Sequence, residues 1–150
     1  MAPEYTFLLE KARKYCAYQE RSIFDVKVKL TSWKLNEKII SEIILQLKKE
    51  DFINEDRFAL AFATGKLRNN KWGRNKISYA LLRKQIPDLT IQIALNSLDQ
   101  EEYLETLKSI IASKKIDDDN EFRRNRKLVK FAQQKGFQPE LCWKVINGDL

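Results

Sequence analysis

Apolar side chains recur along this chain at intervals of three and four residues, the spacing of one face of an α-helix. The clearest stripe follows Asn36 and consists of Ile39, Ile40, Ile43, Ile44 and Leu47. Asn36 suits the N-cap of that helix because its side-chain oxygen can accept a hydrogen bond from an unpaired backbone N–H. Apolar residues at every second position, the mark of a strand, do not recur. The pattern predicts an all-α fold.

Three helical segments follow one another three times, with a period of roughly fifty residues. Ser22 and Asp25 fit the capping box of the second segment, Asn54 opens the second round and Asp99 the third. Pro139 suits the first turn of the last helix. The predicted units are residues 4–53, 54–98 and 99–147 of a single domain.

Each predicted unit is too small to bury its apolar faces alone. We therefore expect neighbouring units to stack into an elongated array, straight or curved. Leu82 does not fit the apolar side of its helix and is expected to lie against a neighbouring unit. One compact helical bundle is the alternative arrangement.

The composition is that of a globular protein, with 43% hydrophobic and 33% charged residues. Only four glycines and three prolines are present, too few for the turns of a many-stranded sandwich. The net charge of +7 favours an anionic partner: nucleic acid, an acidic protein groove or an anionic membrane surface. Solubility alone is the simpler explanation of the charge.

Catalytic and metal-binding chemistry is not expected. The sequence has no histidine, which removes the commonest general base and metal ligand, and it has no phosphate-cradling glycine motif. Cys16 and Cys142 lie too far apart for a zinc site of the CxxC kind and suit buried positions, although their pairing stays open. The sequence predicts neither an enzyme nor a cofactor.

An acidic run superficially similar to a calcium loop covers Asp117, Asp118, Asp119, Asn120 and Glu121. It lacks the required glycine and has Leu128 where the bidentate glutamate belongs. We expect the run to cap the helix that follows it.

The first residues lack a secretory signal, and no stretch approaches the roughly 20 apolar residues of a membrane span. A cytoplasmic location is the expectation.

A basic corner stands out in residues 57–86, which contain eight basic residues and no acidic one. Lys76, Tyr79 and Arg83 are spaced to share one helix face, with Ile77 and Leu81 on another. Cations beside aromatic rings can bind single-stranded nucleic acid or anchor a protein interface; a solvated face with Trp72 packed in the core is the alternative. The candidate partner-binding residues are Lys66, Arg68, Lys71, Trp72, Arg74, Lys76, Tyr79 and Arg83.

A second basic cluster follows the acidic run and consists of Arg123, Arg124, Arg126, Lys127 and Lys130. Part of this cluster is expected to pair with the acidic run, which gives it less weight as a binding site. If the units stack as predicted, the basic corner and the second basic cluster can line one surface.

The stretch DRFALAFATGKLRNNKWGRNKISYALLRKQI resembles the central signature of the RecX regulatory proteins. The matching positions are Arg57-Phe58-Ala59, Phe62, Lys71-Trp72-Gly73, Lys76-Ile77, Leu81, Lys84 and Ile86, preceded by residues 52–56. The flanking thirds agree mainly in length and helix order. Trp72 stands where a tyrosine is common, and Asn75 and Ser78 depart from the arginine-rich helix of many members.

The resemblance implies tandem three-helix repeats and a modulator of the RecA recombinase. Such a protein lies in the groove of the RecA–single-stranded DNA filament and restrains its ATPase, strand-exchange and co-protease activities. Lys71, Arg74, Lys76 and Arg83 would then attract the filament, with contact area from Trp72 and Tyr79. Arg57 and Phe58 would hold the unit together. The sequence leaves the oligomeric state open, and a monomer is the simplest interpretation. The competing hypothesis is a protein that binds nucleic acid directly, without RecA.

Overall fold

The fold is all-α, as predicted: the computed structural model describes residues 3–150, and within them there are nine helices and no strand. The helices are α1 (Pro3–Tyr18), α2 (Ile23–Ser32), α3 (Glu37–Lys49), α4 (Glu55–Asn70), α5 (Arg74–Arg83), α6 (Asp88–Asn96), α7 (Gln100–Ser113), α8 (Glu121–Gln134) and α9 (Pro139–Ile146).

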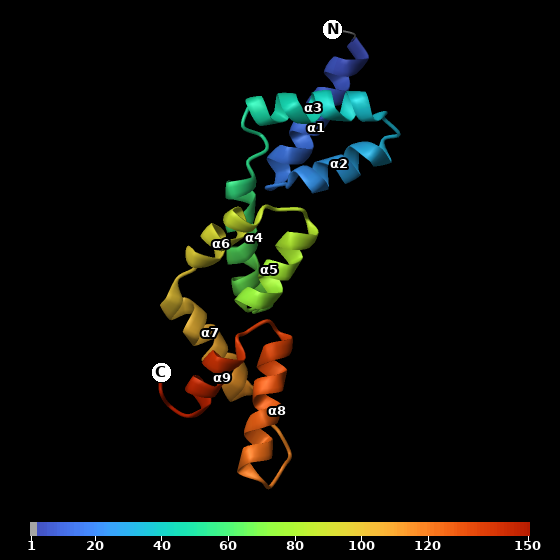
Figure 1. Ribbon diagram of the computed structural model, residues 1–150. Helices are drawn as coiled ribbons and strands as arrows, with labels where there is room; N and C mark the ends of the chain where they lie inside the picture. The colour runs from blue at the N-terminus through green and yellow to red at the C-terminus, as the bar shows by residue number, and fades with distance from the viewer. Residues whose placement is uncertain (1–2) are drawn as a thin grey trace.

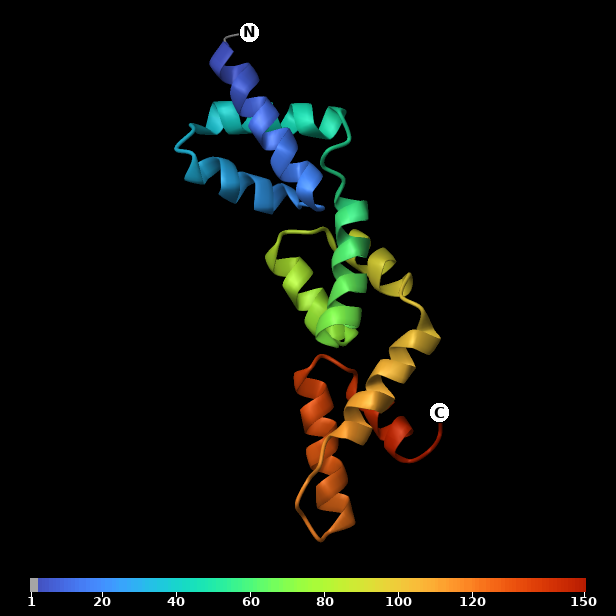
Figure 2. The same cartoon turned by 180° about the vertical axis from the view of Figure 1, so that it is seen from behind.

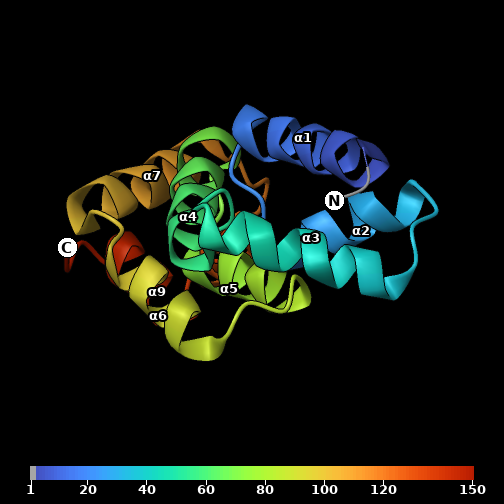
Figure 3. The same ribbon diagram turned by 90° about the horizontal axis from the view of Figure 1, so that it is seen from above.

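The nine helices lie in three tiers along one axis (Figure 1). The tiers are α1–α3, which we call the first unit, α4–α6, the second unit, and α7–α9, the third unit. The reverse view shows the same elongated order, and the view from above shows the first unit offset sideways from α7 and α9 (Figures 2 and 3). The predicted elongated array is therefore confirmed, and a compact bundle is not formed.

Polar side chains begin several helices where the sequence pattern places them. Ser22 Oγ accepts a hydrogen bond from the backbone N of Asp25 at 3.0 Å, and Asp25 Oδ2 accepts one from the backbone N of Ser22 at 3.1 Å. This is the predicted capping box. Asn36, Asn54 and Asp99 likewise cap α3, α4 and α7 with their side-chain oxygens. Local sequence thus determines these helix starts.

Within residues 3–150, two separate hydrophobic cores stabilise the protein. The first unit has its own core of ten buried side chains, whereas the second and third units share one core of eighteen. Continuous apolar packing makes the second and third units one body, while the first unit depends on its smaller core. Leu82, expected between units, is 58% exposed, so that prediction was wrong.

Polar contacts join the first unit to the second. Arg57 of α4 forms ion pairs with Glu20 and with Asp51, the latter at 3.0 Å between Nη1 and Oδ2. Lys84 Nζ lies 2.6 Å from Asp25 Oδ1, which connects α5 to the start of α2. Phe58, next to Arg57, is 5% exposed and belongs to the core, as expected. Ion pairs in contact with water contribute little stability each, so this junction is weaker than a shared core.

Two glycines join the second unit to the third. The N–H of Gly73 donates to the carbonyl oxygen of Lys135 at 2.8 Å, and the N–H of Asn75 donates to that of Gly136 at 2.9 Å. A Cβ atom on Gly73 would lie 2.4 Å from the backbone of Gly136 and Phe137. Only glycine therefore allows this approach of the two backbones. The third unit thereby satisfies N–H groups at the start of α5, which has no side-chain cap.

Each of the two cores contains one cysteine. Cys16 lies in the core of the first unit and Cys142 in the shared core, and both are free thiols. Burial is the main reason that the pKa of each thiol is raised, to about 11. Both properties oppose reaction in the folded state, because the thiolate is the reactive form.

We expect Cys16 to become reactive at lower urea concentration than Cys142, because its core is smaller and the junction next to it is polar. Thiol labelling at a series of urea concentrations, with the modified residue identified by mass spectrometry, measures both midpoints. Coincident midpoints for the two cysteines would show that the chain unfolds as one unit and would contradict the division into two cores.

Candidate partner-binding surface

The basic corner is built by a tight turn between α4 and α5. Lys71 ends α4 in the left-handed conformation, with φ of 56°, and its N–H donates to the carbonyl oxygen of Leu67 at 3.1 Å. The N–H of Trp72 donates to the carbonyl oxygen of Lys66 at 3.1 Å, and Gly73 then begins α5. This turn brings side chains from the end of α4 beside those from the start of α5.

Trp72 lies between two lysines from the two helices. Lys66 Nζ is 4.9 Å from the centroid of the Trp72 ring, and Lys76 Nζ is 4.6 Å from it. Both distances allow cation–π attraction. The indole is half-buried and packs against the shared core. Trp72 therefore combines the two predicted alternatives: it is anchored in the core and also supports the cations of the surface.

The outer face of α5 agrees with the predicted spacing. Lys76, Tyr79 and Arg83 are exposed, whereas Ile77 and Leu81 are fully buried. Tyr79 is 62% exposed, and Arg83 Cζ lies 5.8 Å from the centroid of its ring. A large aromatic surface next to free cations is typical of a recognition surface.

Arg68 and Arg74 have partners within the chain. Arg68 Nε lies 2.7 Å from Glu102 Oε1 of α7. Arg74 donates from Nε to the carbonyl oxygen of Leu95 at 3.3 Å, and its guanidinium carbon lies 4.1 Å from the centroid of the Tyr103 ring. Both arginines therefore bind the second unit to the third, a role that their basic character alone does not indicate.

Tyr103 completes this junction. It is fully buried, its hydroxyl accepts from the N–H of Arg74 at 2.9 Å and donates to Gln138 Oε1 at 2.5 Å. Burial is the largest cause of the raised pKa of this phenol. The role of this hydroxyl exists only where the two units meet, so the pattern along the chain does not indicate it.

Apart from Arg74, which is held by Leu95 and Tyr103, four cations of the basic corner form no ion pair with an acidic side chain within residues 3–150: Lys66, Lys71, Lys76 and Arg83. With Trp72 and Tyr79 they form the surface that we call the lysine–aromatic face. Its charge is not compensated inside the chain, so it is available to an anionic partner.

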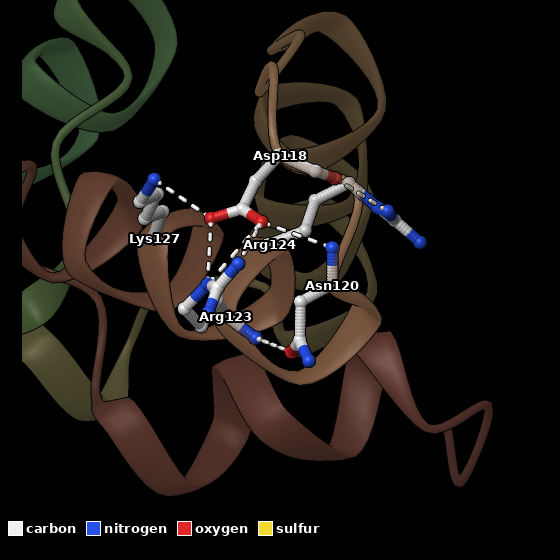
Figure 4. A network of polar contacts seen from close by, with 5 residues as sticks. All are labelled: Asp118, Asn120, Arg123, Arg124 and Lys127. Carbon is white, nitrogen blue, oxygen red and sulfur yellow. Dashed lines mark hydrogen bonds and ion pairs between the residues drawn. The ribbon is translucent and has the colours of Figure 1, made fainter.

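The second basic cluster is organised around Asp118 (Figure 4). Asp118 Oδ2 lies 3.2 Å from Arg123 Nε and 2.9 Å from Lys127 Nζ, and its backbone oxygen accepts from Arg124 Nη1 at 2.8 Å. Hydrogen bonds from Arg123, Lys127 and the N–H of Asn120 hold the pKa of Asp118 far below its ordinary value. The predicted pairing with the acidic run is confirmed, and Asn120 caps α8, as expected for that run.

Four cations of this cluster, including two that pair with Asp118, line a hollow of about 600 Å³ between α8 and α9. Its lining consists of Arg123, Arg126, Lys127, Val129, Lys130, Gln133, Pro139 and Trp143. Sequence reasoning named the four cations but missed Trp143. The spacing of Pro139 and Trp143, which share one face of α9, is the signal that could have revealed it. That the two basic clusters line one surface stays a prediction.

Groups of acidic, cysteine or histidine side chains able to hold a metal ion are absent from residues 3–150. In the same part of the chain, none of the helices has the length and apolar character needed to cross a membrane.

Comparison with known proteins places these features in a family. Residues 54–95, which contain the basic corner, match the sequence model described as RecX, second three-helix domain. Over 150 aligned residues the chain is 30% identical to the regulatory protein RecX of Clostridium acetobutylicum, with 95% of this chain and 67% of that protein covered. The chain belongs to the RecX family.

The chain spans a smaller part of other RecX proteins. The chain is 29% identical to the regulatory protein RecX of Bacillus pumilus over 142 residues and spans 53% of that protein. It is 27% identical to that of Clostridium perfringens over 127 residues and spans 59% of it. RecX is a family of regulatory proteins by name.

Solved RecX structures have the same fold. The crystal structure of RecX from Lactobacillus salivarius superposes with a TM-score of 0.86 at 24% identity, covering 99% of this chain and 97% of that one. A second crystal structure of a regulatory protein RecX gives a TM-score of 0.82 at 21% identity, over 96% of this chain and 74% of that one. At these identities the likeness establishes the helical array and nothing finer.

Proposed function

We propose that this RecX-family chain binds the RecA–single-stranded DNA filament and restrains its ATPase, strand-exchange and co-protease activities. It acts in the cytoplasm as a monomer, without a cofactor. The lysine–aromatic face supplies the attraction: Lys66, Lys71, Lys76 and Arg83 meet anionic groups of the filament, and Trp72 and Tyr79 add contact area.

One observation supports this assignment above the others: Lys66 and Lys76 lie over Trp72 without an acidic partner within residues 3–150. Cations that serve only solubility are normally interspersed with acidic side chains. Here the turn fixes two ammonium groups on one anchored ring, which lowers the entropy lost on binding. Arg68 and Arg74, expected from the sequence to contact the partner, are assigned instead to holding the second and third units in position.

Direct binding of nucleic acid without RecA is the second candidate. Exposed Tyr79 beside Arg83 favours it, because an accessible ring next to a cation can stack on a base while the cation meets a phosphate. Binding of this kind requires only the nucleic acid and depends steeply on salt.

Titrating the chain against bare single-stranded DNA and against the nucleotide-bound RecA filament, each across a salt series, separates the two. We expect tighter binding to the filament at every salt concentration, with a shallower salt dependence, because protein contacts add to the phosphate contacts. Equal affinity for bare DNA and filament, with the same salt dependence, would favour the direct nucleic-acid binder instead.

A further inference from the structure

The hollow between α8 and α9 differs from the lysine–aromatic face in shape and in chemistry. It is concave, with a volume of about 600 Å³, and none of its eight lining residues is acidic. Its floor is apolar: Val129 is 6% exposed, and Pro139 and Trp143 form the wall on α9. A concave apolar floor with a few polar groups at its edge is the usual form of a binding site.

Three polar side chains of α8 form the opposite wall. Arg126, Lys130 and Gln133 recur one helical turn apart and line the hollow together. At a rise of about 1.5 Å per residue, the first and last lie about 10 Å apart along the helix. Arg126 and Lys130 present donors only, since arginine and lysine side chains have no acceptor, and the Gln133 amide adds a further donor beside its own carbonyl oxygen. The wall therefore selects acceptors that are themselves spaced by one helical turn.

The charge of the hollow is limited to two uncompensated cations. Arg123 and Lys127 also line it, but both pair with Asp118 (Figure 4). Arg126 and Lys130 form no ion pair within residues 3–150. Binding a nucleic-acid backbone would require a longer row of unpaired cations, because each phosphate carries a charge. Two carboxylates one helical turn apart have the spacing of Arg126 and Lys130.

The indole ring of Trp143 stacks on the ring of Phe122. The two ring centroids lie 6.3 Å apart, with an interplanar angle of 20°. One face of the indole is thereby occupied, and Phe122 is itself 64% exposed beside Arg126. The Trp143–Phe122 pair extends the apolar floor and fits an aliphatic or aromatic side chain better than a series of stacked bases, which needs several free ring faces.

We propose that the hollow between α8 and α9 binds an acidic amphipathic helix of a partner protein. Two carboxylates of that helix, one turn apart, pair with Arg126 and Lys130, and an apolar side chain beside them fills the floor over Val129 and Trp143. Grooves between two helices commonly accept a third helix in this way. The inference does not depend on the proposed filament role, because the hollow and its charges are properties of the chain alone.

A synthetic amphipathic peptide tests the proposal. Its probe form carries two glutamates one helical turn apart next to a leucine anchor, and its control form has asparagine in place of that leucine. Fluorescence anisotropy of the labelled peptides measures affinity, and the indole N–H signal of Trp143, assigned with a Trp143→Phe variant, reports where the peptide binds. We expect the probe peptide to bind, to shift this signal, and to bind more tightly than the asparagine control.

Matched variants locate the site. Combined Arg126→Glu and Lys130→Glu changes should weaken peptide binding about tenfold or more, because two attractions become repulsions. Lys27→Glu with Lys38→Glu, which alters net charge equally on exposed positions of the first unit, should leave it unchanged. No binding of the probe peptide, equal loss in both double variants, or an unlabelled oligothymidine that displaces the peptide and shifts Trp143 more strongly would each overturn the proposal. Because no filament is present, failure here leaves the proposed filament role standing.

Discussion

Replacing Gly73 by alanine should separate the second and third units and lower the free energy of unfolding by about 3 kcal/mol or more. The added Cβ would lie 2.4 Å from Gly136 C and Phe137 N, which are backbone atoms and cannot move independently. The two corners must then part, and the hydrogen bond from Gly73 to Lys135 is lost with them. Urea unfolding followed by circular dichroism measures the change.

Gly65 supplies the matched control for this substitution. It lies inside α4, and a Cβ there would meet only Asn69 Nδ2, at 3.9 Å. Alanine is the better helix former, so Gly65→Ala should raise stability by up to about 1 kcal/mol. If Gly73→Ala proves as harmless as Gly65→Ala, the backbone contact does not join the units as described.

Reversing two charges of the lysine–aromatic face should abolish most of the effect on the filament. In the Lys76→Glu, Arg83→Glu variant we expect half-maximal inhibition of RecA ATPase to require at least about tenfold more protein, since two attractions become repulsions. Both side chains are exposed and form no ion pair within residues 3–150. The fold should persist, because the glutamate at position 76, in the first turn of α5, is favoured by the helix dipole, which offsets the small cost of the glutamate at position 83 in the last turn.

The Lys27→Glu, Lys38→Glu variant controls for net charge in this assay as well, because it changes the charge equally at exposed sites of the first unit. It should inhibit the filament as the unchanged protein does. Undiminished inhibition by a folded Lys76→Glu, Arg83→Glu variant would remove α5 from the proposed interface.

The sequence predicts most of the local structure because caps and helical stripes depend on residues near one another in the chain. The capping box of Ser22 and Asp25 and the stripe of α3 are examples. The outer face of α5, from Lys76 to Arg83, follows from spacing in the same way. These features require only the geometry of one helix.

The roles of several site residues arise from contacts between units and were therefore not visible in the sequence. Arg68 looks like any surface cation until α7 brings Glu102 within 2.7 Å. Arg74 is held by Tyr103, which is 29 residues away. Leu82 breaks the apolar pattern of α5 because it is exposed, and no sequence rule distinguishes that from packing against another unit. Tertiary contacts decide these cases.

A structure of the chain bound to the RecA–single-stranded DNA filament would show which surface of the chain makes the contact. We expect the turn from Lys66 to Arg83 to lie in the filament groove, with Trp72 and its two lysines at the contact. A complex in which this turn faces solvent, with the filament held by another surface of the chain, would contradict this expectation.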